Sequence, residues 1–266
     1  MKNFVSKDSI VRQIWGNGDT ILFIFAGAAA EFALNKAVDW LYYTGRLPAD
    51  PMGRLFSTVS YARDIIFLDE EAALKAIDKI TAIHGAVEKS RGATIPDWAY
   101  RDVLFMLIHY SLASFELLQR KLTESEKEEV FDVFYRVGNR MQLKGLPLTY
   151  SQWIQMHAEH LEQNLEKGKY TIDLYKQYKK HLGFIRYKLL LQAQALVVPK
   201  RVNALLNLGR ATFIVPTLFL YKMSRALKIE WMLKSLILPP AYKKQIKDLD
   251  ALPLPAKDNL SSKVVL

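Results

Sequence analysis

The most constraining feature of this sequence is the spacing of its apolar residues, which recur three and four positions apart along nearly its whole length. The strict apolar and polar alternation of a half-buried strand is absent. Side chains three and four apart share one face of an α-helix, so the pattern predicts an all-α protein. Half of the residues are hydrophobic, and no long polar linker divides the chain. We expect one domain, a multi-helix bundle over residues 1–248, followed by a flexible, proline-punctuated tail over residues 249–266.

Local signals predict where the helices begin and end. Asp19 is expected to cap a long helix over residues 20–43. Asp50, followed by a proline, and Asp69, followed by two glutamates, are expected to cap the next two helices. The remaining helices are expected over residues 97–121, 123–134, 149–166, 171–183, 185–198, 202–224 and 229–238.

The residues that are missing exclude several kinds of chemistry. The chain has no cysteine, which removes disulfides, thiolate metal sites, iron–sulfur clusters and a cysteine nucleophile. Any metal must therefore be held by histidine, by carboxylates or within a cofactor. The first residues lack the apolar stretch of roughly 7 to 15 residues that a signal peptide needs, so a cytoplasmic location is expected.

The charge of the chain is unevenly distributed. Residues 1–165 contain 18 Lys and Arg against 21 Asp and Glu, whereas residues 166–266 contain 19 against 6. Such a basic region can attract nucleic acid, anionic lipid or an acidic partner. No nucleic-acid-binding signature accompanies it, so no nucleic-acid partner is expected. A solvated helix surface is the favoured interpretation, and a peripheral membrane contact stays open.

Two positions near the middle of the first half could serve a site. Arg54 and Thr58 lie four residues apart on the helix that Asp50 opens, so a cation and a hydroxyl share one face, with Tyr61 one turn further. From spacing alone the favoured roles are structural, with the arginine on a carboxylate and the threonine on a backbone carbonyl.

His84 is the clearest candidate ligand. It follows Ala73, Ile77 and Ile80 and precedes Val87 at steps of four, three, four and three, which predicts that it points into the protein. A single inward histidine is more often a hydrogen-bonded core residue than a ligand. An inward imidazole beside the small Gly85 would also suit the axial ligand of a buried haem.

These residues carry a resemblance to a known family. The chain resembles, over about residues 15–198, the catalytic domain shared by the latex-clearing rubber oxygenases and the fungal mycophenolic-acid oxygenase. The resemblance rests on Tyr43-Thr44-Gly45-Arg46-Leu47, Arg54-Leu55, Thr58, Ile83-His84 and Val87. It implies a globin-like core that binds haem b, with His84 on the iron and with Arg54 and Thr58 at the pocket.

The resemblance also implies a function. It predicts a haem-dependent oxygenase that uses dioxygen on an apolar, isoprenoid or lipid-like substrate. Rubber oxygenases carry a lysine just before the threonine, whereas this chain has Ser57, which puts rubber itself in doubt as a substrate. The alternative is a non-catalytic helical module that binds a lipid surface or a partner through its basic C-terminal helices.

The other histidines are weaker candidates. His109 is expected to be a hydrogen-bonded helix residue, although its face is also compatible with a role near the pocket. His157 and His160 could share a metal, but the adjacent Glu159 and Glu162 favour a solvated surface patch. His181 is expected at the surface, next to two lysines.

Overall fold

The computed structural model describes residues 2–45 and 49–210, except the side chains of residues 51, 52 and 54–56. Every regular element within these residues is a helix, which confirms the all-α prediction. The helices are α1 (Ile10–Trp15), α2 (Gly18–Leu34), α3 (Asp39–Tyr43), α5 (Pro51–Phe67), α6 (Glu70–Arg91), α7 (Asp97–Leu118), α8 (Glu124–Arg140), α9 (Tyr150–Gln163), α10 (Lys169–Val197) and α11 (Lys200–Leu206).

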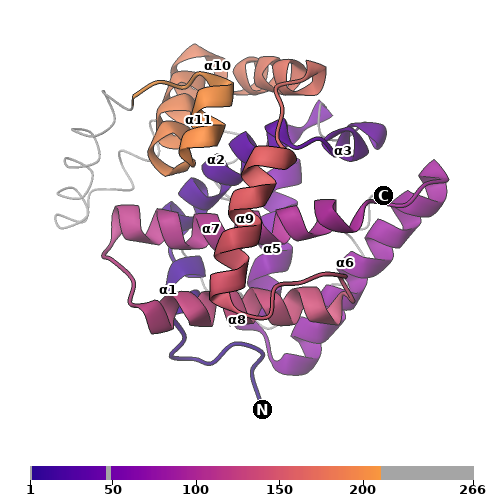
Figure 1. Ribbon diagram of the computed structural model, residues 1–266, viewed down its shortest axis with the longest axis vertical. Helices are drawn as coiled ribbons and strands as arrows, with labels where there is room; N and C mark the ends of the chain where they lie inside the picture. Colours follow the sequence, from indigo (N-terminus) through magenta and orange to yellow (C-terminus); the bar gives the residue numbers. More distant parts are fainter. Residues whose placement is uncertain (1, 46–48, 211–266) are drawn as a thin grey trace.

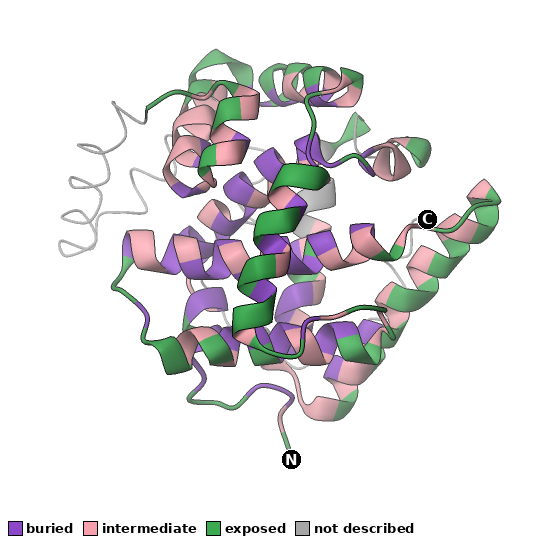
Figure 2. Cartoon of the chain, viewed as in Figure 1, coloured by how far each residue is buried: buried purple, intermediate pink, exposed green. Residues whose placement is uncertain are grey.

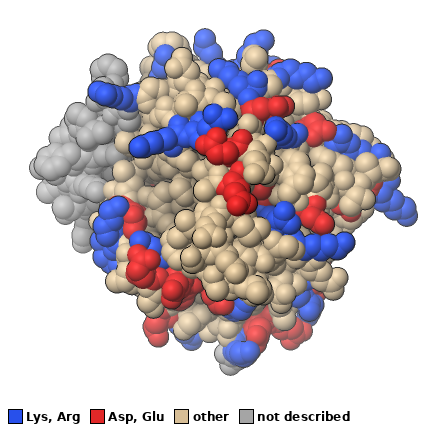
Figure 3. All heavy atoms as spheres, in the orientation of Figure 1, with Lys and Arg blue, Asp and Glu red and all other residues tan. Residues whose placement is uncertain are grey.

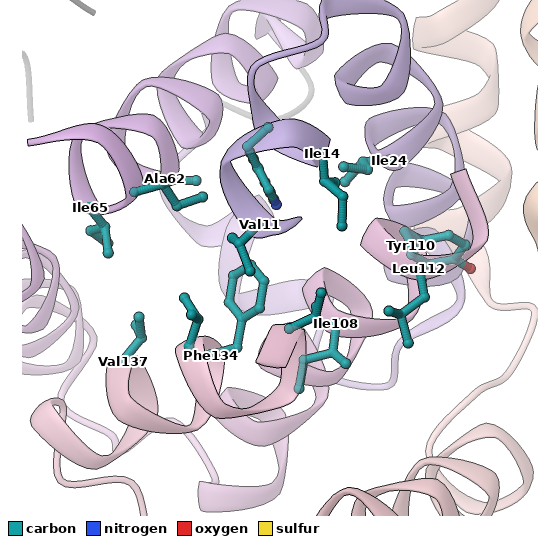
Figure 4. Close-up of a cluster of buried hydrophobic side chains, with 14 of the residues drawn as sticks. Val11, Ile14, Ile24, Ala62, Ile65, Ile108, Tyr110, Leu112, Phe134 and Val137 are labelled. Carbon is teal, nitrogen blue, oxygen red and sulfur yellow. The ribbon is translucent and has the colours of Figure 1, made fainter. Parts of the chain in front are cut away.

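The short helix α1 lies in the middle of the main core. Val11, Ile14 and Trp15 are fully buried, and the Trp15 indole nitrogen donates a hydrogen bond to Ser111 Oγ at 3.1 Å. Figure 4 shows side chains from α2, α5, α7 and α8 around α1. Burial of such side chains is the main favourable term in folding, so α1 joins four longer helices that are apart in the sequence.

Helices α2 and α7 pack closely against each other. Gly27 on α2 lies against the ring of Tyr110 on α7, where a larger residue would overlap the ring. Helices α10 and α11 cover the C-terminal half of α2, while α9 crosses in front of α7 and α6 extends away from the bundle (Figure 1). The exposed residues gather on the outer faces of α6, α9 and α10 (Figure 2).

The predicted helix over residues 20–43 is wrong, because the chain leaves the helix at Asn35. The Asn35 backbone is extended, and its side-chain oxygen accepts a hydrogen bond from the Ala37 backbone at 2.8 Å. The Asn35 side-chain nitrogen donates to Asp102 Oδ2 on α7 at 3.2 Å. Asn35 also pairs with Leu165 in an isolated antiparallel bridge. A short polar side chain that bonds its own backbone favours a turn, so α2 stops there.

Most of the predicted caps are confirmed. Asp50 accepts a hydrogen bond from a backbone N–H of α5, and Asp69 does so for α6. The helix predicted from residue 123 begins there as well, since Thr123 forms a capping box at the start of α8. At α2 the prediction of Asp19 is wrong, since Asn17 accepts from the Thr20 backbone at 3.0 Å. An N-cap residue lies outside the first turn, and Asp19 is already within it.

The last described helices differ in length from those predicted. The two helices expected at residues 171–183 and 185–198 form one kinked element, α10, with Gly183 at φ +72° between them. Helix α11 ends at Leu206, because Asn207 adopts the left-handed conformation that terminates helices. The rest of the helix predicted at 202–224, the helix at 229–238 and the tail lie outside the described residues. Among the described helices, none has the length and apolarity to cross a membrane.

Candidate functional site

Helix α5 carries the first pair of predicted site residues. Arg54 lies in its second turn, and Thr58 and Tyr61 follow at half-buried positions. The Lys79 side-chain nitrogen on α6 lies 5.8 Å from the centre of the Tyr61 ring. Residues three apart share a helix face, so the face with Thr58 and Tyr61 is turned toward α6.

His84, which was predicted to point into the protein, lies on α6 in a half-buried position. Ala73 and Ile77 in the first half of α6 are fully buried, but Val87 is half-buried like His84. The reason is that the second half of α6 extends beyond the bundle, so the apolar stripe continues past the helices that cover its beginning (Figure 2). Periodicity predicted the correct face of α6 but not what covers it.

The surroundings of His84 are well defined on one side. The ring of Tyr100, in the first turn of α7, lies 5.2 Å from the imidazole and nearly perpendicular to it. The Tyr100 hydroxyl donates to Glu88 Oε1 at 3.1 Å, and the same oxygen accepts from the Ile95 backbone at 2.8 Å. Burial and this carboxylate raise the pKa of Tyr100, so the phenol stays protonated. A side chain added at Gly85 would meet no atom within 4 Å, so the helix surface next to His84 is open.

Helices α5 and α6 place Arg54 and His84 at similar distances from the corner that joins them. Arg54 lies about 20 Å before the end of α5 and His84 about 20 Å after the start of α6, measured along each helix axis. The residue types of the predicted site thus occur on two consecutive, contacting helices. The hypothesis that the three residues form one pocket stays a prediction.

A second group of polar residues lies inside the protein, and its position overturns the expectation of a surface patch at His157 and His160. Both histidines are buried, and their rings stack at 6.1 Å between centres. Trp153 stacks on His157 at 5.3 Å, with the ring planes nearly parallel. Trp153, His157 and His160 follow at steps of four and three and form the inner stripe of α9, whereas Glu159 lies on its outer face. The same periodicity that singled out His84 would have found this stripe.

Glu31 on α2 is the centre of this buried polar cluster. Its side chain is fully buried and accepts a hydrogen bond from the Tyr110 hydroxyl at 2.7 Å. Its other carboxylate oxygen lies 3.1 Å from His160 Nε2 and 3.8 Å from His157 Nε2. A buried carboxylate is costly unless charges and hydrogen bonds compensate it, and these three side chains supply that compensation. In the sequence, Glu31 is visible as the one charged residue between Asp19 and Lys36.

Asp102 on α7 is the second carboxylate of the cluster. It lies on the other side of His160, with Oδ2 2.7 Å from Nδ1 in an ion-pair contact. Asn35 and Asn164 donate to the same oxygen at 3.2 and 3.1 Å. His160 is therefore held between two buried carboxylates from two different helices, and the cluster joins α2, α7 and α9.

The surroundings of His160 and Glu31 shift their pKa values in opposite directions. Burial by itself lowers the pKa of His160, but Asp102 and Glu31 raise it more, to about 9. Burial by itself raises the pKa of Glu31, yet His157 and His160 hold it well below its usual range. At neutral pH His160 is therefore an imidazolium cation and Glu31 a carboxylate anion.

His109 on α7 lies at the edge of the same cluster. Its ring is 4.9 Å from that of His157, and the Val197 backbone carbonyl accepts a hydrogen bond from it. Burial, and next the nearby His157, lower the pKa of His109 to about 4, so it is neutral at physiological pH. The expectation of a hydrogen-bonded helix residue agrees with this contact.

The first two turns of α7 separate the cluster from His84. Tyr100 contacts His84, and Asp102, two residues later, contacts His160 on the other side of the helix. Residues two apart point in nearly opposite directions on a helix, so the two groups lie on opposite sides of α7. Within residues 2–45 and 49–210, no three His, Cys, Asp or Glu side chains form a group that could hold a metal ion. The cluster fixes charge inside the bundle, where His160 lies between Glu31 and Asp102.

The raised pKa of His160 predicts that the protein loses stability in mild alkali. A group whose pKa is higher in the folded state stabilises it fully below its unfolded pKa, about 6.5, and loses that contribution as the pH rises through the folded pKa. The free energy of unfolding should therefore fall by a few kcal/mol between about pH 6.5 and pH 10. Urea denaturation across this range measures the change. His160→Gln should flatten the slope and His181→Gln, at an exposed position on α10, should not; equal slopes in all three proteins would contradict the prediction.

Comparison with known proteins identifies the family. The all-α bundle carries a half-buried histidine, His84, on α6 and an Arg-x-x-x-Thr pair, Arg54 and Thr58, on the preceding helix α5. Residues 13–236 match the family described as ER-bound oxygenase mpaB/B'/Rubber oxygenase, catalytic domain. The chain belongs to this family of oxygenases. No curated protein and no solved structure matches the chain.

Proposed function

We propose that the chain is a haem b-dependent oxygenase in which His84 is the axial ligand of the iron. Family membership supports an oxygenase, and the observation that carries the haem proposal is the position of His84. Its imidazole is half-buried on a helix that extends from the bundle, with Tyr100 against one side and open surface at Gly85. An imidazole ligand needs a neutral ring with a fixed orientation, and the Tyr100 contact can provide that orientation.

Arg54 and Thr58 would complete the pocket from α5. Arginine keeps its positive charge at all physiological pH values, so Arg54 suits a carboxylate of the cofactor. Thr58 can donate a hydroxyl hydrogen bond on the face that is turned toward α6. Bound haem would supply the activation of dioxygen, and the chain would bind the substrate, orient it and exclude water.

The substrate is proposed to be apolar, of an isoprenoid or lipid-like kind. Ser57 is short and neutral where rubber oxygenases carry a lysine, so the polymer-cleaving reaction is not transferred to this chain. Dioxygen consumption by the haem-loaded protein should rise with an isoprenoid alcohol and stay at background with its saturated analogue of equal length. Equal consumption with both compounds would contradict a reaction of dioxygen at the double bonds of an isoprenoid substrate.

Replacing the proposed ligand is expected to abolish haem binding. The protein supplied with haem should show a Soret band that shifts on reduction and again with carbon monoxide, and His84→Ala should lose this band and the bound iron. His181→Ala is the matched control, since it removes an exposed histidine from α10 and should leave the spectrum unchanged. In His84→Gly, added imidazole should restore the band, which separates loss of the ligand from misfolding. A wild-type protein that binds no haem, or a full Soret band in His84→Ala, would refute the assignment.

A further inference from the structure

The kink of α10 exposes two large apolar side chains side by side. Phe184 is 65 % exposed and Ile185 is 74 % exposed, directly after Gly183. Adjacent residues on a straight helix point about 100° apart, so a helix that packs on a core normally buries one of them. The positive φ of Gly183 breaks the helix at this point and leaves both side chains exposed at the corner between the two halves of α10.

Lysines surround this corner on both sides along the chain. Lys176, Lys179 and Lys180 are exposed before the kink, and Lys188 is exposed after it. The Lys188 side-chain nitrogen lies 5.7 Å from the centre of the Phe184 ring. In the described part of the chain, none of these four lysines forms an ion pair. Figure 3 shows Lys and Arg along the upper edge of the molecule, over α10.

The acidic residues that would balance this charge are absent from the surrounding sequence. Residues 174–210 contain eight Lys and Arg and no Asp or Glu. The positive charge around the two apolar side chains attracts an anionic lipid layer. Once the apolar side chains reach this layer, they can leave water and enter it.

We propose that the kink of α10, with Phe184 and Ile185 at its tip and the four surrounding lysines, docks on the surface of an anionic phospholipid membrane. The lysines would contact the lipid phosphates and carboxylates, and the two apolar side chains would enter the boundary between headgroups and acyl chains. This proposal does not depend on haem binding, so either can fail alone.

Two other kinds of partner fit the surface less well. Two projecting side chains offer roughly 250 Å² of apolar area, far below the about 800 Å² per partner of a stable protein interface. A nucleic acid would use the lysines and stack a base on Phe184, but Ile185 offers no stacking surface for a base. A lipid layer uses the charge and the apolar tip together.

The test measures binding of the full chain to vesicles by flotation. Wild-type protein should bind vesicles of phosphatidylcholine with phosphatidylserine, bind phosphatidylcholine alone at least about tenfold more weakly, and lose affinity as salt rises. Phe184→Ser with Ile185→Ser should lower the affinity about tenfold or more, and so should Lys179→Glu with Lys180→Glu. Unchanged thermal unfolding would show that these surface variants remain folded.

Matched controls come from the connection between α8 and α9. Leu148 is 71 % exposed and Lys144 is exposed, so Leu148→Ser with Lys144→Glu changes the same chemistry away from the kink and should leave binding unchanged. Equal binding of wild type and both α10 variants, or no binding of wild type, would overturn the proposal. Light scattering gives a further test. If the wild type were a dimer and Phe184→Ser with Ile185→Ser a monomer, the tip would be an interface between two copies of the chain, and the proposal would be overturned.

Discussion

Replacing Glu31 with leucine is expected to lower the free energy of unfolding by about 3 to 5 kcal/mol at neutral pH. The carboxylate is fully buried and lies between the Tyr110 hydroxyl and the His160 imidazolium. Without it, the hydroxyl loses its acceptor and the cation loses one of its two anions, and neither can reach water. Urea denaturation followed by far-ultraviolet circular dichroism measures the loss. A loss below about 1 kcal/mol would mean that the cluster is hydrated or that its charges are not fixed.

The matched control for Glu31 is a surface glutamate on a helix. Glu71 pairs with Lys75 at 2.6 Å, but both side chains are exposed, so Glu71→Leu should change the free energy of unfolding by no more than about 0.5 kcal/mol. The double variant Glu31→Leu with His160→Leu removes the cation together with one anion, and should be less destabilised than the sum of the two single variants. Additive losses would show that the two side chains do not interact.

Replacing Gly27 with alanine is expected to destabilise the protein by about 2 kcal/mol or more, although alanine is the better helix former. The added Cβ would overlap the ring of Tyr110. That ring is fully buried, and its hydroxyl is held by Glu31, so it cannot move aside without breaking a buried hydrogen bond. The overlap therefore outweighs the gain of about 1 kcal/mol that alanine brings to a helix interior. Thermal or urea denaturation gives the value.

The same substitution at Gly85 should have the opposite sign. Gly85 is also inside a helix, but a Cβ there would meet no atom within 4 Å, so Gly85→Ala should stabilise the protein by about 0.5 to 1 kcal/mol. The comparison is made on protein prepared without haem, because Gly85 adjoins the proposed ligand His84. If both variants were equally stable, close packing of α2 on α7 would not be the reason for glycine at position 27.

The proposed site on α5 and α6 was predictable from the sequence only in part. Its helices were predictable, because Asp50 and Asp69 cap α5 and α6 through bonds to backbone groups three residues away. The face on which His84 lies was also predictable, because a helix period fixes it. Its half-buried state was not, since that depends on how far α6 extends beyond the helices that cover its first half (Figure 2).

The sequence by itself determined the features that depend on residues close together in the chain. These are the helical class, most of the caps, the uneven distribution of charge and the motif around Arg54, Thr58 and His84. Only the tertiary structure decided which residues meet. The Asn35 side chain at the end of α2 is held by Asp102, which is 67 positions away, and His160 meets Glu31, which is 129 positions away. A helix period tells which side chains share a face, but the helix packed against that face decides whether a histidine there meets water or a carboxylate.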